Sequence, residues 1–86
     1  MENLVIVNNV PETRFQALVG GHLALLDYQV REGEFRIDYV YVPADYRGRG
    51  IAGQLMEAAL EYAQNEGLRV NPICSYARAY IARKSP

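Results

Sequence analysis

The sequence has a single cysteine (Cys74), a single histidine (His22) and no tryptophan. A lone cysteine excludes a disulfide within the chain and favours a reducing, cytoplasmic setting. Without a close cluster of acidic residues, one cysteine and one histidine offer no ligand set for a metal ion. No run approaches the roughly 20 apolar residues that span a bilayer, and the N-terminus lacks a signal-peptide pattern. We therefore expect no metal site and no membrane contact.

The charge balance argues against nucleic acid as a partner. The formal net charge is −1, with 9 basic and 10 acidic residues, whereas proteins that bind phosphate backbones have a basic surface. The charges are unevenly placed, because residues 67–86 hold four basic residues and no acid. This stretch can favour a small anionic ligand or form an ordinary solvated surface, and the composition leaves both interpretations open.

The length of 86 residues allows one hydrophobic core, so we expect a single domain over residues 1–86. The patterns predict a mixed α+β fold in the order β-β-β-α-β-α: an antiparallel three-strand meander, a helix, a parallel fourth strand and a short C-terminal helix. The predicted strands are Arg14–Val19, His22–Val30, Phe35–Val42 and Leu68–Asn71, and the predicted helices are Ile51–Glu66 and Tyr76 to about Arg83, the second capped by Ser75.

Two details of this pattern are more specific. The apolar run Leu4–Val7 is a further strand or a lead-in, which the polar residues Asn8 and Asn9 end. Within the third predicted strand, strict alternation puts four residues on one face of the sheet: Phe35, Ile37, Tyr39 and Tyr41.

The stretch Arg47-Gly48-Arg49-Gly50-Ile51-Ala52 joins the third strand to the long helix. The first turn of a helix has backbone N–H groups without intrahelical partners, and the helix dipole adds partial positive charge there. Because Gly48 and Gly50 lack a Cβ, a diphosphate can approach the main chain closely. Arg47 and Arg49 add charge and fork-shaped donors. The pattern favours an anion-binding loop over a helix that merely follows a glycine-rich turn.

Residues 48–53 also satisfy the G-x-G-x-x-G pattern of dinucleotide-binding folds. In those folds the first glycine directly follows a strand, and an acidic residue about 20 positions further on holds the ribose. Here five residues, Pro43 to Arg47, intervene, and no acid follows Glu66. We interpret this match as accidental.

The loop resembles the signature Q/R-x-x-G-x-G/A of the GNAT N-acetyltransferases, with Arg47, Gly50 and Ala52 at the defining positions. The chain further resembles a small GNAT-like subfamily of about this length. Its members share V-P-x-x-x-R/G-G-x-G-[IL]-A, a helix and a P-x-C-x-[YF] segment, which is Pro72-Ile73-Cys74-Ser75-Tyr76 here. The resemblance covers residues 13–83.

The resemblance implies a minimal GNAT-like fold with acetyl-CoA as cosubstrate, lying across a splayed pair of parallel strands. The pantetheine is expected on the strand backbone near Tyr39, Tyr41 and Val42, and the pyrophosphate on the loop amides. The implied cofactor-binding residues are Tyr41, Val42, Arg47, Gly48, Arg49, Gly50, Ile51 and Ala52.

Two departures from the family limit what the resemblance implies. The subfamily often has His-Thr-Glu-Val where residues 39–42 are Tyr-Val-Tyr-Val, so no acid–base role of that histidine or glutamate is carried over. The flanking elements that form the amine pocket of full-length GNAT enzymes are also missing.

Cys74 and Tyr76 are the candidate catalytic residues. In GNAT enzymes a tyrosine often protonates the leaving thiolate, and Tyr76 matches the motif better than Tyr80. Cys74 precedes the final helix, whose dipole favours a thiolate, and Arg78 lies one turn further on. Cys74 can accept the acetyl group in a two-step mechanism, or it is a small buried hydrophobe. The sequence leaves both roles open.

Three functions remain open. The first is transfer of an acetyl group from acetyl-CoA to an unidentified amine. The second is CoA binding without turnover, because the acceptor elements are missing. The third is a small protein-interaction domain that uses its edge strands or its basic C-terminal stretch. The acceptor pocket can be open, shared across a homodimer or supplied by a partner protein.

Overall fold

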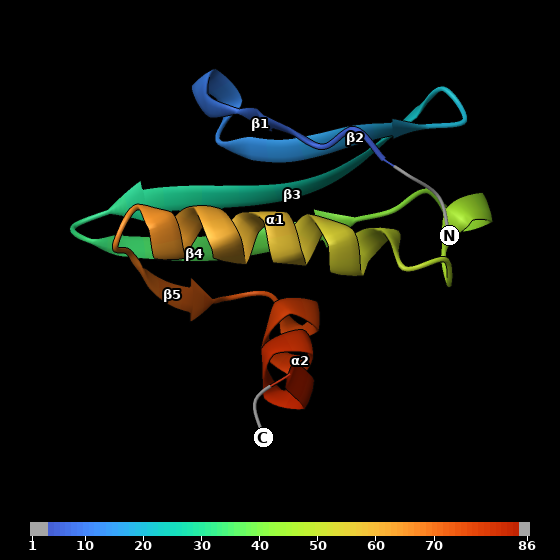
Figure 1. Cartoon of the computed structure of the whole chain (residues 1–86). Helices are drawn as coiled ribbons and strands as arrows, with labels where there is room; N and C mark the ends of the chain where they lie inside the picture. Colours follow the sequence, from blue (N-terminus) through green and yellow to red (C-terminus); the bar gives the residue numbers. More distant parts are fainter. Residues whose placement is uncertain (1–3, 85–86) are drawn as a thin grey trace.

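A five-stranded sheet forms one layer of the molecule, and helix α1 lies along one face of it (Figure 1). The computed structural model describes residues 4–84. The strands follow the order of the chain across the sheet, with β1 to β4 antiparallel and β5 parallel to β4. The elements are β1 Val7–Asn9, β2 Arg14–Val19, β3 His22–Arg31, β4 Glu34–Tyr41, α1 Ile51–Asn65, β5 Arg69–Pro72 and α2 Ser75–Lys84, with 3-10 turns at Val10–Glu12 and Ala44–Tyr46.

The predicted α+β order is confirmed, and the bounds of the six predicted strands and helices lie within one residue of those observed. Helix α1 forms because apolar residues recur along one face of it, and this buried stripe packs on the sheet. The buried residues of the stripe are Ile51, Leu55, Met56, Ala59 and Ala63.

The core lies between α1 and the inner face of the sheet. Four aromatic rings meet there: Phe15, Tyr28 and Phe35 from the strands and Tyr62 from α1. Tyr28 and Phe35 stack with ring centroids 4.7 Å apart. Each fully buried large apolar side chain contributes about 1.5–3 kcal/mol to folding. This packing fixes the position of α1 over β2, β3 and β4.

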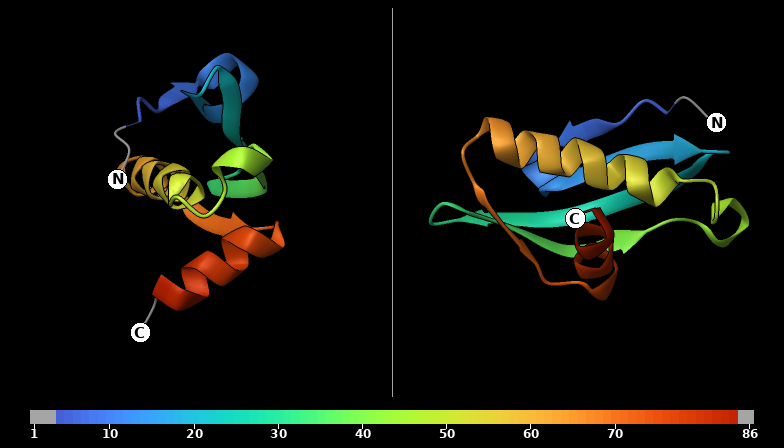
Figure 2. Two further views of the ribbon diagram at one scale, coloured as in Figure 1. Left: turned by 90° about the vertical axis from the view of Figure 1, so that its right-hand side faces the viewer. Right: turned by 60° about the horizontal axis from the view of Figure 1, so that its bottom comes forward.

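Strands β4 and β5 pair along only the first half of β4. Their register runs from Glu34↔Arg69 to Ile37↔Pro72. The amides of the next two residues of the chain then both donate to the Ile37 carbonyl, at 3.0 and 3.1 Å. From there α2 leads away from the sheet, on the same side as α1 (Figure 2). Within residues 4–84, residues 38–41 therefore have no strand partner on this edge.

A β-bulge in β4 changes which side chains face the core. The register between β3 and β4 shifts at Asp38, which has no partner on β3. Before the bulge, Phe35 and Ile37 are fully buried, whereas after it Tyr39 and Tyr41 are 51% and 37% exposed. The prediction that these four residues share one face was wrong, because strict alternation takes no account of an inserted residue.

The first strand begins where the sequence predicted that it would end. It includes Asn8 and Asn9, and the antiparallel meander therefore has four strands instead of three. The Tyr28 hydroxyl donates to Asn8 Oδ1 at 2.7 Å, and Asn9 Nδ2 donates to Gln16 Oε1 at 3.3 Å. These partners across the sheet outweigh the low strand propensity of asparagine.

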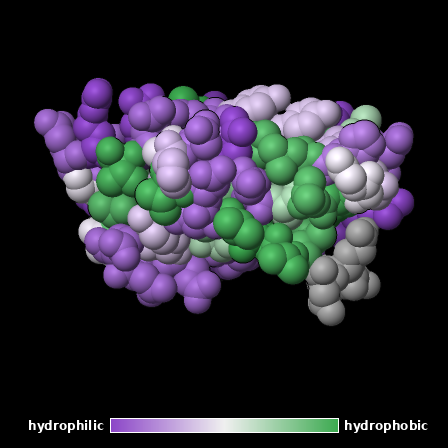
Figure 3. Space-filling view, turned by 90° about the horizontal axis from the view of Figure 1, so that it is seen from above, coloured by the Kyte–Doolittle hydropathy of each residue, from purple (hydrophilic) through white to green (hydrophobic). Residues whose placement is uncertain are grey.

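The edge near β1 and β2 has an apolar surface. Seen from above these strands, apolar residues gather beside a hydrophilic region (Figure 3). Val5 is 81% exposed and Leu18 is 70% exposed. A shallow hollow of about 430 Å³ is lined by Leu4, Val5, Val7, Gln16, Ala17, Leu18 and Leu23.

Candidate functional site

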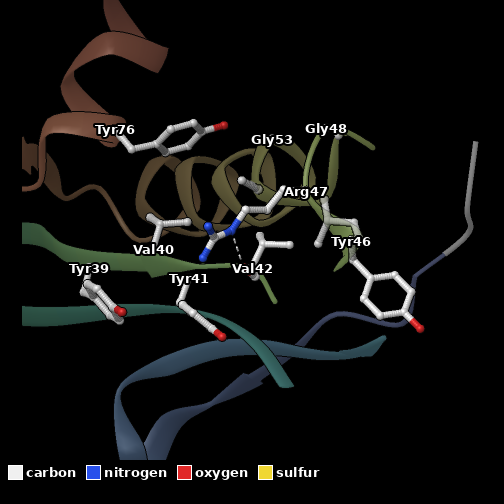
Figure 4. Close-up of a pocket in the computed structure, with 12 residues that line it drawn as sticks. Tyr39, Val40, Tyr41, Val42, Tyr46, Arg47, Gly48, Gly53 and Tyr76 are labelled. Carbon is white, nitrogen blue, oxygen red and sulfur yellow. Dashed lines mark hydrogen bonds between the residues drawn. The ribbon is translucent and has the colours of Figure 1, made fainter. Parts of the chain in front are cut away.

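A cleft of about 480 Å³ opens between the end of β4, the loop before α1 and the start of α2 (Figure 4). The unpaired edge of β4 forms one wall, and the first turn of α1 forms another. Of the predicted site residues, all except Arg49 and Cys74 line this cleft. The complete lining is Tyr39, Val40, Tyr41, Val42, Tyr46, Arg47, Gly48, Gly50, Ile51, Ala52, Gly53 and Tyr76.

The first turn of α1 presents backbone donors to the cleft. Gly50 is the N-cap, and within the described part of the chain no side chain caps the helix there. The first intrahelical bond runs from the Gln54 amide to the Gly50 carbonyl, at 3.1 Å. The amides of Ile51, Ala52 and Gly53 therefore lack intrahelical acceptors, and the dipole of this 15-residue helix makes the place electropositive. Such a helix start suits a diphosphate.

Gly48 and Gly50 leave the loop surface open. Their φ angles are +79° and +80°, a region that residues with a Cβ rarely adopt. A Cβ added at either position would meet no atom of residues 4–84 within 4 Å. The space above both glycines is therefore open to a ligand that lies against the main chain.

Tyr46 holds this loop against the hairpin between β2 and β3. A Cβ on Gly20 would overlap the Tyr46 ring, so only glycine allows this close approach. The Arg49 guanidinium lies over the same ring, 5.0 Å from its centroid. Arg49 thus contacts Tyr46 and is not part of the cleft lining.

Arg47 lies across the cleft. Its Nε donates to the Val42 carbonyl oxygen at 2.8 Å, and its guanidinium carbon is 5.8 Å from the centroid of the Tyr41 ring. Figure 4 shows this side chain reaching from the loop to the end of β4. The carbonyl predicted to meet the pantetheine therefore has a partner from the protein itself. The sequence pattern gave no indication of this contact.

The Tyr76 ring extends over the cleft from the first turn of α2, on the opposite side from Tyr39 and Tyr41 (Figure 4). Burial raises the pKa of its hydroxyl above the ordinary value of 10.0, Arg83 lowers it, and Cys74 adds a smaller rise. The hydroxyl therefore stays protonated at neutral pH, as a proton donor must.

Tyr80 has a different environment. Its hydroxyl donates to the Glu57 carboxylate on α1, which also accepts from Lys84 Nζ at 2.7 and 2.9 Å. Burial and the bond to Glu57 raise the pKa of Tyr80 to about 12. Tyr80 is absent from the cleft lining and joins α2 to α1. The structure thus separates the two tyrosines that the sequence offered as proton donors.

Cys74 lies at the N-terminal end of α2, but its thiol acts as the helix cap. The Ala77 amide donates to Cys74 Sγ at 3.3 Å. The predicted cap, Ser75, was wrong by one position, because Ser75 is already the first residue of the helix. Cys74 is partly buried against the core. Cys74 therefore differs from Tyr76: its thiol is hydrogen-bonded to the Ala77 amide, and it does not line the cleft.

Three lining residues were missing from the sequence-based prediction: Val40, Tyr46 and Gly53. Gly53 could have been included, because it contributes one of the free amides of the first helical turn. Val40 faces the cleft only because of the bulge at Asp38. Tyr46 depends on its contact with Gly20, which is distant in the sequence.

The described part of the chain, residues 4–84, contains no group of three or more His, Cys, Asp or Glu side chains placed to bind a metal ion. Neither helix in this range combines the length and the apolar character needed to cross a bilayer.

The sequence and the fold are both similar to those of known proteins. The sequence model of the GCN5-related N-acetyl-transferases matches residues 14–86. An NMR solution structure of a GCN5-like protein from Staphylococcus aureus superposes with a TM-score of 0.76 and 28% identity, covering 98% of this chain and 83% of that one. A crystal structure of a GCN5-related N-acetyltransferase from Sphaerobacter thermophilus gives a TM-score of 0.65 and 29% identity, covering 76% of this chain and 22% of that one.

Longer relatives match part of the chain. Protein NATD1 of chicken (Gallus gallus) and of mouse (Mus musculus) are each 40% identical to it over 45 residues, which are 52% of this chain and 41% of theirs. The chain therefore matches less than half the length of these relatives.

Proposed function

Because this chain belongs to the GCN5-related N-acetyltransferase family, we propose that it transfers an acetyl group from acetyl-CoA to an amine. The proposal is carried by one observation: a single cleft connects the unpaired edge of β4 to the uncapped amides at the start of α1. The first surface suits an extended amide chain and the second suits a diphosphate. Acetyl-CoA contains both groups.

The two walls of the cleft suggest how the donor is oriented. The amides of residues 51–53 and the open surface at Gly48 and Gly50 would hold the diphosphate. The backbone of β4 beyond the bulge would bind the pantetheine amides. The acetyl end would then lie near Tyr76, which lines the cleft from α2.

We propose direct transfer as the chemistry. The amine nitrogen forms a bond to the acetyl carbon, the carbon–sulfur bond breaks, and the departing thiolate takes a proton from the Tyr76 hydroxyl. The attacking amine loses its proton to water, and Tyr76 regains one from solvent. This role rests on the place of Tyr76 in the cleft and on its raised pKa.

We assign Cys74 a structural role as a helix cap. Its thiol accepts the Ala77 amide and lies outside the cleft lining. The competing two-step mechanism would form a thioester on Cys74 and release CoA before an amine arrives. Intact-mass analysis after incubation with acetyl-CoA tests the two mechanisms. The two-step mechanism predicts an added acetyl group that is lost in Cys74→Ala, whereas direct transfer predicts no acetyl group on Cys74.

Two measurements test the proposed function itself. Isothermal titration with acetyl-CoA should give saturable binding. If no heat is detected at millimolar ligand, and a fluorescence or NMR titration also shows no binding, the proposal is wrong. The release of CoA thiol is then followed with a panel of amines, such as polyamines, lysine peptides and peptides with free N-termini. Turnover with any member supports transfer, whereas binding without turnover favours a CoA-binding module. That alternative is the second of the functions that the sequence leaves open.

A further inference from the structure

We infer that Arg47 makes the cleft selective for thioesters that carry a diphosphate. Its side chain occupies the pantetheine path at Val42, and a bound diphosphate draws the guanidinium away from that path. The inference rests on the proposed binding of acetyl-CoA in this cleft. It adds a specificity determinant that acts before any chemistry takes place.

The contact that carries the inference lies at the end of β4. Arg47 Nε donates to the Val42 carbonyl oxygen at 2.8 Å, and the guanidinium lies 5.8 Å from the Tyr41 ring centroid. All three residues line the cleft. Val42 follows the stretch of β4 that has no partner on its β5 side. Arg47 therefore takes the acceptor on which an extended ligand would align.

The same arginine is next to the diphosphate position. Arg47 directly precedes Gly48, which lines the cleft beside the first turn of α1. The Arg47 residue is exposed, so its side chain can change rotamer without disturbing the core. One guanidinium can thus reach either the Val42 carbonyl or an anion on the loop.

The exchange of partners favours one class of ligand. A pantetheine amide that bonds to Val42 replaces a charge-assisted hydrogen bond with a neutral one, which is weaker. A thioester without a diphosphate offers the displaced guanidinium no charged acceptor in return. A thioester with a diphosphate offers it charged oxygens in fork geometry. Ligands shift such an equilibrium only through their different affinities for its two states, so the diphosphate is the group that opens the path.

The first test compares two ligands and two arginine variants. S-acetylpantetheine has the thioester and amide chain of acetyl-CoA but no diphosphate. In Arg47→Ala, its affinity should rise about three- to tenfold, the effect of removing one competing hydrogen bond, while acetyl-CoA affinity falls. Arg49→Ala is the matched control, because it removes the same charge from the same loop but leaves the contact at Val42. It should weaken acetyl-CoA without strengthening S-acetylpantetheine.

The second test uses the unmodified protein. Inorganic pyrophosphate should raise the affinity for S-acetylpantetheine, because it recruits the guanidinium and frees the Val42 carbonyl. Sodium chloride of equal ionic strength should not have this effect. The coupling is reciprocal, so S-acetylpantetheine should raise the affinity for pyrophosphate by the same factor. Arg47→Ala should abolish the coupling.

The outcomes separate this inference from the proposed function. If acetyl-CoA does not bind the unmodified protein, the proposed function fails and the inference fails with it. If acetyl-CoA binds, but S-acetylpantetheine binds Arg47→Ala no better than the unmodified protein, the inference is wrong and the proposed function stands. Undetectable S-acetylpantetheine binding to both proteins counts as the same negative result. Absence of pyrophosphate coupling overturns the inference even if the variant fails to fold.

Discussion

The Tyr80 hydroxyl donates a hydrogen bond to the Glu57 carboxylate, and this contact ties α2 to the outer side of α1. Tyr76 lies one helical turn before Tyr80, and the centroids of the two rings are 6.2 Å apart. The tie at Glu57 therefore helps to fix the ring that extends over the cleft. Tyr80 acts as a positioning residue, whereas Tyr76 is the candidate for contact with the substrate.

Replacing Glu57 with glutamine should loosen α2. Lys84 loses its ion-pair partner, and Tyr80 keeps only a neutral acceptor. Because the pair is about half exposed, we expect a loss of only about 0.5–1 kcal/mol in urea denaturation. Faster amide exchange in α2 than in α1 should accompany it. Glu61→Gln removes the same charge one turn further on and is the control; an equal effect in both variants would contradict a specific tie.

The contribution of Glu57 should depend on pH. Lys84 first, and Tyr80 next, hold the pKa of this carboxyl below its ordinary value of 4.5. A lowered folded-state pKa means that the stabilisation is complete above pH 4.5 and is lost as the pH falls through the folded-state value. The stability difference between the unmodified protein and Glu57→Gln should therefore disappear in acid. An NMR titration of Glu57 with a midpoint at or above 4.5 would rule out this account.

Closing the space above the loop should weaken acetyl-CoA binding. In the double variant Gly48→Val, Gly50→Val, side chains occupy open space at the diphosphate position, and we expect at least about a tenfold loss of affinity, or 1.4 kcal/mol. Gly33→Val is the control for backbone strain. Gly33 also has a positive φ, +78°, and open space around it, but it lies in the turn between β3 and β4, away from the diphosphate position. Unchanged affinity in a folded double variant would count against the diphosphate assignment.

Gly20 should affect the loop from a distance. A Cβ at Gly20 overlaps the Tyr46 ring, whereas one at Gly21 meets no atom within 4 Å in the described residues. Both glycines have positive φ, so the two alanine variants share the backbone strain. Gly20→Ala should lower acetyl-CoA affinity severalfold by displacing Tyr46, while Gly21→Ala should retain it. Equal affinities would show that the position of Tyr46 does not matter for binding.

The sequence predicted those parts of the candidate site that depend only on neighbouring residues in the chain. The free amides after Gly50 follow from a glycine-rich loop ahead of an amphipathic helix, and this part of the prediction matches the cleft. The bulge at Asp38 was not predictable, because it arises from pairing between β3 and β4. The contact of Arg47 with Val42 also depends on how the loop folds back in three dimensions.

The region around α2 shows the same division. The P-x-C-x-Y segment placed Cys74 at the start of the helix, but one residue of register decides whether Cys74 or Ser75 caps it. From the sequence, either Tyr76 or Tyr80 could be the proton donor, and only the motif favoured Tyr76. Only the position of Glu57 on α1 identifies Tyr80 as the one that ties the helices together.

Tyr76→Phe should lower turnover far more than it lowers acetyl-CoA affinity. Loss of a proton donor typically costs about 10²- to 10⁴-fold in rate, while the ring that lines the cleft is retained. Tyr80→Phe is the comparison, and its smaller effect should come with a loosened α2. Because burial holds the pKa of Tyr76 above 10.0, turnover should not decline through proton loss from Tyr76 below that pH. Equal turnover in Tyr76→Phe and the unmodified protein would remove Tyr76 as the donor.

The most direct measurement is an NMR titration of backbone amides with acetyl-CoA. Our account predicts that the largest shifts occur at residues 48–53 and 39–42, which line the cleft on both sides. The amides of β1 and β2, on the far edge of the sheet, should change little. Saturable shifts that leave the loop before α1 unchanged would show that the ligand binds elsewhere and would contradict the site described for this chain.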